Sequence, residues 1–203
     1  AGFMTFGPLV TTQWLADHLD EKDLKIMDGS WRMPGNGDAI DNYNAQHISG
    51  AVFFDIDAIS DKSSDLPHML PSPAQFETAM GALGVSDTDR VVIYDEKGLM
   101  SAARVWWTFR TMGHKHVAVL DGGLPKWLKE QRAVTADQSV PVQTTYKASP
   151  VRPRLRRHDP ARWRRGARRP LAGAVLGQGR RTPGGASLGP HAGRGLPALW
   201  PGA

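Results

Sequence analysis

The chain has 203 residues and a mass of 22.2 kDa, which fits one globular domain with an appendage but not two full α/β domains. It contains no cysteine, which excludes disulfides, thiolate metal sites, iron–sulfur clusters and a cysteine nucleophile within this chain. No apolar run approaches the roughly 20 residues of a membrane-spanning helix. The first ten residues lack the pattern of a secretory signal, so we expect a cytoplasmic protein that does not bind a membrane.

Charge is divided unevenly along the chain. Residues 1–150 carry 13 basic and 19 acidic residues, whereas residues 151–203 carry 12 arginines and one acidic residue. Arginine, glycine, proline and alanine fill 37 of the 53 positions of the second segment. The isoelectric point near 9.7 therefore describes that segment alone. We expect residues 1–150 to form one folded domain and residues 151–203 to be a disordered basic tail.

Strands and helices are predicted to alternate along residues 1–150. In chain order, we expect a helix from Thr11 or Thr12 to Leu19, strands at 25–28 and 51–55, a helix at 73–83, a strand at 90–95, a helix at 101–112, a strand at 117–120 and a helix at 124–131. Ser72 followed by Pro73 is a typical helix start, and Gly84 is a typical helix end. The alternation favours βαβ units around a parallel sheet, which indicates the α/β class.

The segment 90–95 is almost continuously apolar, which is typical of a central parallel strand buried on both faces. Ligands of open α/β sheets bind at the carboxyl ends of the strands. The loop 95–101 is therefore the expected ligand-binding loop, and the helix that follows it can bind an anion at its N-terminus. Asp95 fits two interpretations at this strand end: an active-site group, or a carboxylate that caps the next helix.

Two segments carry several potential metal ligands. Residues 55–61 hold three aspartates, but an EF-hand calcium loop needs glycine at its sixth and glutamate at its twelfth position. Ser60 and Leu66 stand there, which argues against calcium. His114 and His116 form a pair on a short turn with no third ligand nearby, so we expect both to face solvent. We predict no metal site and no cofactor.

A Pro-rich loop contains a histidine with two interpretations. A lone loop histidine such as His68 is usually structural, but Asp57 lies eleven residues earlier, which makes an orienting carboxylate–imidazole pair possible. Trp106 and Trp107 are adjacent on a predicted helix and face different sides of it. We expect one of them to pack in the core and the other at an interface.

Four phrases resemble the first domain of the tandem-rhodanese sulfurtransferases, the family of 3-mercaptopyruvate and thiosulfate sulfurtransferases. They are HISGAVFFDID at 47–57, PHMLP at 67–71, SAARVWW at 101–107 and LDGGLPKW at 120–127. The phrases occur in the family's order, and the resemblance runs from about Leu9 to Val134. It implies that residues 1–150 are a single, non-catalytic rhodanese-like domain, with a five-stranded parallel sheet and helices on both faces.

The resemblance also implies roles for three residues. In this family, a cysteine of the second domain takes sulfur from 3-mercaptopyruvate or thiosulfate and passes it to a thiol, a thioredoxin-like protein or cyanide. Asp57 and His68 match the first-domain pair that completes a Ser–His–Asp arrangement with a serine of the second domain. Asp95 stands where an active rhodanese domain has its cysteine. A carboxylate cannot form a persulfide, and we expect its charge to oppose anion binding by the loop, so this chain is predicted to be inactive alone.

After Pro150 the resemblance stops, and the following segment is consistent with a frameshift. We combined the last two bases of each codon with the first base of the next, and listed the residues that this permits. The permitted residues include DARSPERF over 168–175 and VRDFADM over 152–159, which resemble the opening of the family's second rhodanese domain. The step from His191 to Ala192 permits only Met or Thr. We therefore expect a frameshift between about Lys147 and Arg152, and a chain truncated before the catalytic cysteine.

Two other functions fit the same sequence. The arginine-rich tail would bind nucleic acid in a salt-dependent manner. It has only two aromatic residues and no recognition motif, so such binding would be unspecific. Alternatively, the domain pairs with a separately encoded catalytic domain through an apolar face that the second domain covers in the family.

Overall fold

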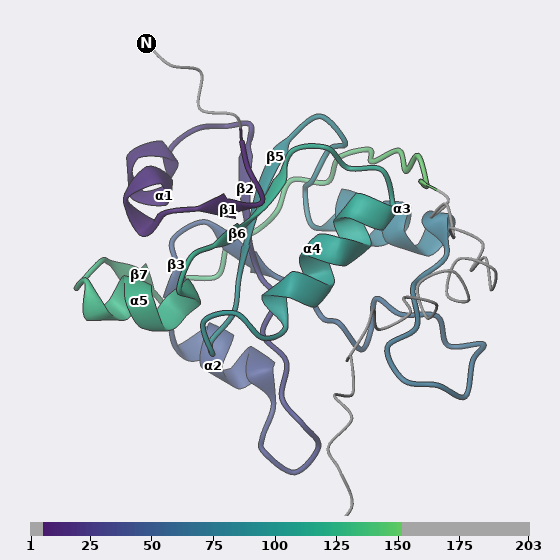
Figure 1. Ribbon diagram of the computed structural model, residues 1–203, viewed down its shortest axis with the longest axis horizontal. Helices are drawn as coiled ribbons and strands as arrows, with labels where there is room; N and C mark the ends of the chain where they lie inside the picture. Colours follow the sequence, from purple (N-terminus) through teal and green to yellow (C-terminus); the bar gives the residue numbers. More distant parts are fainter. Residues whose placement is uncertain (1–5, 152–203) are drawn as a thin grey trace, which may run out of the picture. The chain divides into compact units, whose positions relative to one another are not determined.

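The computed structural model describes residues 6–151 and shows an α/β domain (Figure 1). The main sheet contains five strands in the order β1-β6-β5-β2-β4, all parallel. These strands are β1 (Leu9–Val10), β2 (Leu24–Asp28), β4 (Ala51–Phe53), β5 (Arg90–Tyr94) and β6 (Val117–Leu120). The predicted fold class and the five-stranded parallel sheet are therefore confirmed. The predictions for residues 152–203, including disorder, lie outside the described residues.

Within residues 6–151, five helices cover both faces of the sheet (Figure 1). They are α1 (Thr12–His18), α2 (Ala39–Ala45), α3 (Pro73–Ala82), α4 (Ala102–Thr111) and α5 (Gly123–Lys129). Alternate residues of β5 divide the core in two: Val91 and Ile93 pack with α3 and α4, whereas Val92 and Tyr94 pack with α1, α2 and α5. All four side chains are fully buried, as expected for a central strand with helices on both faces.

The predicted ends of the third helix are confirmed. Ser72 accepts a hydrogen bond from the backbone N–H of Gln75, while the Gln75 side chain accepts one from the N–H of Ser72, so the two form a capping box ahead of α3. Pro73 occupies the first helical turn. Gly84 follows the last turn with φ +74°, and a Cβ there would meet the carbonyl oxygen of Val142 at 2.9 Å, so both backbone conformation and space favour glycine.

Four elements were missed from the sequence. Strand β1 and the small antiparallel sheet of β3 (His47–Ile48) and β7 (Val134–Thr135) have only two residues per strand, which is too short to show a period. Helix α2 has only two buried residues and no side-chain cap, so neither an apolar stripe nor a start signal marks it. The strand predicted at 51–55 ends at Phe53, because the Asp55 carboxylate accepts the Ala58 N–H and starts a turn.

Candidate functional site

Three loops meet at the carboxyl edge of the sheet. They follow the neighbouring parallel strands β2, β4 and β5, and the carboxyl ends of parallel strands lie at one edge. The loop after β2 supplies Trp31, the long loop after β4 supplies Asp57 and His68, and the loop after β5 begins with Asp95 and leads into α4. The sheet topology thus gathers side chains that are far apart in the sequence.

Asp57 and His68 lie together, which is the second of the two arrangements that the sequence left open. The imidazole Nδ1 is 2.9 Å from the Asp57 Oδ1, which is ion-pair distance. The Trp31 indole Nε1–H donates to the other carboxylate oxygen of Asp57 at 3.0 Å. The Trp31 ring also packs edge-on against the His68 ring, with centroids 5.0 Å apart. Asp57 is thus held by the indole on one side and faces the imidazole on the other.

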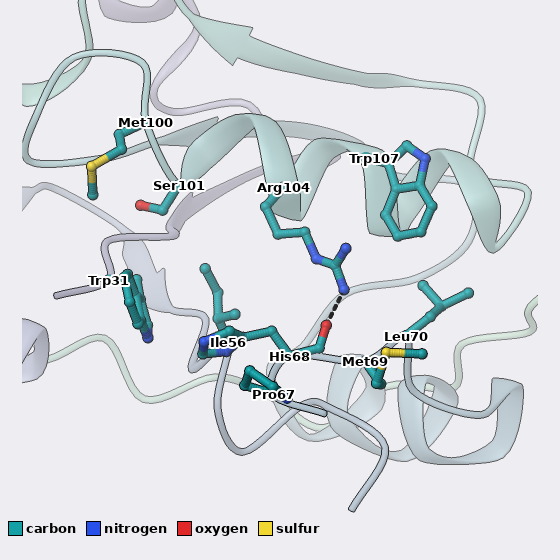
Figure 2. Close-up of a pocket in the computed structure, with 10 residues that line it drawn as sticks. All are labelled: Trp31, Ile56, Pro67, His68, Met69, Leu70, Met100, Ser101, Arg104 and Trp107. Atoms are coloured by element: carbon teal, nitrogen blue, oxygen red, sulfur yellow. Dashed lines mark hydrogen bonds between the residues drawn. The ribbon is translucent and has the colours of Figure 1, made fainter. Parts of the chain in front are cut away.

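A pocket of about 510 Å³ opens beside this pair (Figure 2). Its walls are mainly apolar, and its polar groups are the His68 ring, the Ser101 hydroxyl and the Arg104 guanidinium. Arg104 reaches from α4 and donates to the backbone carbonyl of His68 (Figure 2). The Ser101 Oγ is buried without a hydrogen-bond partner. A pocket of this size, with few polar groups among apolar walls, is typical of a binding site.

Large apolar side chains around the pocket are exposed. We call the following three residues the apolar rim: Met69, Met100 and Trp107. Their relative exposures run from 40% for Met69 to 49% for Met100. All three line the pocket itself, so pocket and rim form one surface. Exposed apolar residues gathered in one place mark an interaction surface, whereas scattered ones do not.

The loop after β5 is closed around the carboxylate of Asp95. One carboxylate oxygen accepts the backbone N–H groups of Lys97 and Gly98 at 2.9 and 2.7 Å. The other accepts those of Met100 and Ala102 at 2.7 and 2.9 Å. Asp95 is fully buried. These contacts match the interpretation of Asp95 as a carboxylate that caps the next helix, because Ala102 is the first residue of α4.

This arrangement corrects one expectation about the loop. We expected the charge of Asp95 to oppose the loop's anion-binding geometry, but the carboxylate itself is the anion that the four N–H groups bind. The charge and the donors are complementary. A second anion would find these donors already occupied.

The ion pair between Arg32 and Glu96, a residue of the loop after β5, was not predicted from the sequence. Arg32 donates two hydrogen bonds to the Glu96 carboxylate, at 2.7 and 2.6 Å, and the Glu96 side chain is only 6% exposed. These bonds raise the pKa of Arg32. The Ser30 hydroxyl accepts the Glu96 N–H, and the Asp28 carboxylate accepts the Ser30 N–H. Burial raises the pKa of Asp28, which favours its neutral form.

The remaining candidate residues have structural contacts. The Asp61 carboxylate bonds Ser63, and no group of three or more potential metal ligands occurs within residues 6–151. The expectation of a solvent-facing pair is wrong for His114, which is 3% exposed and lies between the Asp89 carbonyl and the Tyr146 hydroxyl. Burial lowers the pKa of His114. His116 is exposed, as predicted.

The core position predicted for one of the two tryptophans is confirmed, whereas the interface position of the other stays a prediction. Trp106 packs against the core and its indole N–H donates to the Val117 carbonyl. Trp107 is exposed on the apolar rim. Three residues of the pocket (Trp31, Ser101 and Arg104) were not identified as site residues. Ser101 and Arg104 lie in the phrase at 101–107, but no pattern in it marked either as functional. Within residues 6–151, every helix is too short or too polar to cross a membrane.

The sheet order, the two-sided helical cover and the site at the carboxyl edge define a rhodanese-type α/β domain. The chain belongs to the rhodanese-like domain family, which matches residues 11–130. Its relatives are sulfurtransferases. It is 52% identical to thiosulfate/3-mercaptopyruvate sulfurtransferase 1, mitochondrial, of Arabidopsis thaliana over 124 residues, which are 61% of this chain and 33% of that protein. It is 45% identical to 3-mercaptopyruvate sulfurtransferase of Rattus norvegicus over 141 residues, which are 66% and 48% of the two chains.

A solved structure agrees with this assignment. The domain is similar to SseA from Escherichia coli, described as a 3-mercaptopyruvate sulfotransferase with the rhodanese fold, with a TM-score of 0.63 and 38% identity over 71% of this chain and 55% of that one. The chain thus spans between a third and about half of the length of the curated relatives it matches. One of these relatives is named as mitochondrial, and the cytoplasmic location expected here stays a prediction.

Proposed function

We propose that residues 1–150 act as the non-catalytic half of a sulfurtransferase and complete the active site of a cysteine-bearing rhodanese domain. The observation that carries this proposal is the Asp57–His68 pair, at 2.9 Å, on the wall of a pocket whose rim is apolar and exposed. Such a surface is suited to a partner that buries the rim and brings its reacting groups to the imidazole.

The reaction supported by the relatives' names is transfer of sulfane sulfur from 3-mercaptopyruvate or thiosulfate. In the family pattern, a cysteine thiolate of the other domain attacks the donor's sulfur and forms a persulfide, and pyruvate or sulfite leaves. A thiol, such as that of a thioredoxin-like protein, or cyanide then takes the outer sulfur. Asp57 faces the Nδ1 of His68, so the Nε2 can accept a hydrogen bond from a hydroxyl of the other domain. The imidazole then holds or orients the hydroxyl proton.

This chain does not carry out that transfer by itself. It has no cysteine, so no persulfide forms on it, and the loop where a rhodanese nucleophile stands is closed on Asp95. The apolar rim is the proposed docking face. A catalytic rhodanese domain is the proposed occupant, because the rim and His68 line the same pocket and the resemblance assigns the Asp57–His68 pair to the first domain.

The test mixes this chain with a separately produced cysteine-bearing rhodanese domain and measures pyruvate release from 3-mercaptopyruvate, with thiocyanate formation from thiosulfate and cyanide as the second assay. We expect the mixture to exceed the rate of the catalytic domain alone. His68→Ala should abolish the gain, whereas His116→Ala, at an exposed histidine away from the site, should not. No gain with the unaltered chain, or an equal loss with both variants, would contradict the proposal.

For residues 151–203 we propose a frameshifted reading of the second rhodanese domain. Resequencing the coding DNA from codon 140 onward tests it: one base gained or lost near codon 150, with a cysteine codon further on in the restored frame, supports the proposal. A DNA sequence identical to the present one contradicts it. In that case the alternative function is non-specific nucleic-acid binding by the arginine-rich segment. Its affinity should fall steeply with salt, and binding should disappear when residues 151–203 are deleted.

A further inference from the structure

The backbone of His68 has an unusual conformation. Its φ is +55°, in the left-handed region that residues other than glycine rarely adopt. Only two of the non-glycine residues described have a positive φ, and this one carries the imidazole that faces Asp57. Such a conformation persists where the surroundings hold it in place. The contacts of the His68 main chain therefore decide where its ring lies.

Arg104 supplies the contact to that main chain. Its guanidinium donates to the carbonyl oxygen of His68, so a residue of α4 fixes the peptide that leaves His68. The pocket view shows this bond as the link between the helix and the loop (Figure 2). Helix α4 has ten residues, and Val105 and Phe109 are fully buried in the core. The helix is thus a firm support for a loop that has no regular structure of its own at His68.

Arg104 is itself oriented by an aromatic ring. Its guanidinium carbon lies over the Trp107 ring, 4.7 Å from the centroid, three residues further along the same helix, where i and i+3 side chains meet. Among residues 6–151, Arg104 forms no ion pair with a carboxylate. Partial burial lowers its pKa. Its charge is thus not committed to a surface salt bridge, and its planar group has two partners: Trp107 and the His68 carbonyl.

The imidazole of His68 is held from the opposite side. Asp57 faces Nδ1 at 2.9 Å, and Trp31 packs edge-on against the ring while donating to Asp57. These contacts position the ring, but they do not touch the carbonyl. Rotation of the His68 backbone out of the left-handed region would swing the ring away from both Asp57 and Trp31. The carbonyl contact and the ring contacts are therefore needed together.

We propose that Arg104, braced by Trp107, is a positioning residue for His68: it holds the carbonyl so that the imidazole faces Asp57. That this matters for sulfur transfer rests on the proposed function, but the positioning is a property of this chain alone. Lysine can donate to a carbonyl but cannot stack as a plane on an indole. Arg104→Lys should therefore keep part of the effect, and Arg104→Gln should lose it.

The test is nitrogen-detected NMR of the histidine side chains in the ¹⁵N-labelled full chain at pH 8, where free imidazole is neutral. The two ring nitrogens of His68, assigned by their loss in His68→Gln, should be widely separated because Asp57 selects one tautomer. We expect the separation to collapse in Arg104→Gln and to be intermediate in Arg104→Lys. Arg110→Gln is the matched control, because Arg110 lies on the same helix and donates to the carbonyls of His114 and Lys115.

Unchanged His68 resonances in Arg104→Gln, or an equal change in Arg110→Gln, would overturn the proposal. If circular dichroism shows that Arg104→Gln does not fold, Trp107→Leu decides, since it removes the brace and leaves the guanidinium; the same collapse is then expected, and no change overturns the proposal. The mixing assay for the proposed function is independent. If no gain in sulfur transfer occurs with the unaltered chain, the proposed function fails, whereas the NMR result still judges the role of Arg104.

Discussion

Removal of the Asp95 carboxylate is predicted to be one of the most destabilising changes at the site. The two oxygens of the fully buried Asp95 accept four backbone N–H groups at 2.7–2.9 Å, three in part-buried hydrogen bonds and one in a buried hydrogen bond. Asp95→Ala leaves these donors without an acceptor, and each buried unsatisfied donor costs about 1–3 kcal/mol. Water entering the vacated space will recover part of this, so we expect a loss of about 4 kcal/mol or more, which is a large share of a stability of roughly 5–15 kcal/mol.

Asparagine at the same position separates charge and geometry. It keeps the size of aspartate, but only one of its two terminal atoms accepts hydrogen bonds. Two of the four N–H groups would then face an amide NH₂, so Asp95→Asn should cost about half as much as Asp95→Ala, on the order of 2 kcal/mol. Asp17→Asn is the control, because Asp17 is exposed on α1 and bonds only Gln13; it should change stability by less than about 0.5 kcal/mol.

The assay is urea unfolding followed by tryptophan fluorescence, with the midpoint and the slope compared between variants. The expected order of midpoints is Asp17→Asn, Asp95→Asn and then Asp95→Ala, from high to low. Sulfate should raise the midpoint of Asp95→Ala more than that of the unaltered chain, because the vacated donors can bind an external anion. If Asp95→Ala unfolds at the same urea concentration as the control variant, the four hydrogen bonds of the Asp95 carboxylate contribute no stability and the reasoning is refuted.

Three further predictions concern the domain around the site. Burial lowers the pKa of His114 below its ordinary 6.5, so at mildly acidic pH this histidine binds more protons in the unfolded chain than in the folded one. The free energy of unfolding should therefore fall as pH is lowered from 7.5 to 5.5. In His114→Gln, the urea midpoint should depend less on pH than in the unaltered chain. Arg32→Met leaves the Glu96 carboxylate, whose side chain is 6% exposed, with only Lys97 at 3.9 Å as an ionic partner, and should cost about 2–4 kcal/mol by urea unfolding. A loss below about 1 kcal/mol, the size expected for an exposed ion pair, would contradict it. Gly113 has φ +88°, and a Cβ at this position would lie 2.0 Å from the Ser149 carbonyl oxygen. Gly113→Ala should therefore lower the melting temperature by several degrees, a loss of roughly 2 kcal/mol. An unchanged melting temperature would show that the chain near Ser149 does not pack against Gly113.

The sequence was informative where one local cause decides the structure. Strand β5 was predictable because four consecutive apolar residues fit only a position buried on both faces, and α3 was predictable because Ser72, Pro73 and Gly84 are strong local signals. The burial of His114 was not predictable, since its partners are a carbonyl 25 positions before it and a hydroxyl 32 positions after it. The Arg32–Glu96 pair spans 64 residues, and neither partner lies in a pattern.

The candidate site shows the same division. The Asp57–His68 pair was one of two interpretations of the sequence, because one loop holds both residues; the two side chains lie 2.9 Å apart, whereas the role of the pair stays a prediction. Arg104 and Trp31 were missed, because each reaches the pair from another element: Arg104 from α4 and Trp31 from the loop after β2. A residue that acts by holding a neighbour's backbone leaves no spacing rule in the sequence. Tertiary contacts of this kind are visible only after the fold brings the elements together.

The hydrogen-bond partners at the carboxyl edge argue for a domain built to be completed by another surface. The four donors of the β5 loop are satisfied from within by Asp95, so that loop needs no ligand. Within residues 6–151, the Ser101 Oγ is a buried side-chain polar atom without a hydrogen-bond partner, and Ser101 lines the pocket. Buried polar groups without partners cost free energy, and a native structure retains them where function requires it. Such a group on the pocket wall, beside an exposed apolar rim, supports our proposal that another domain docks on this face.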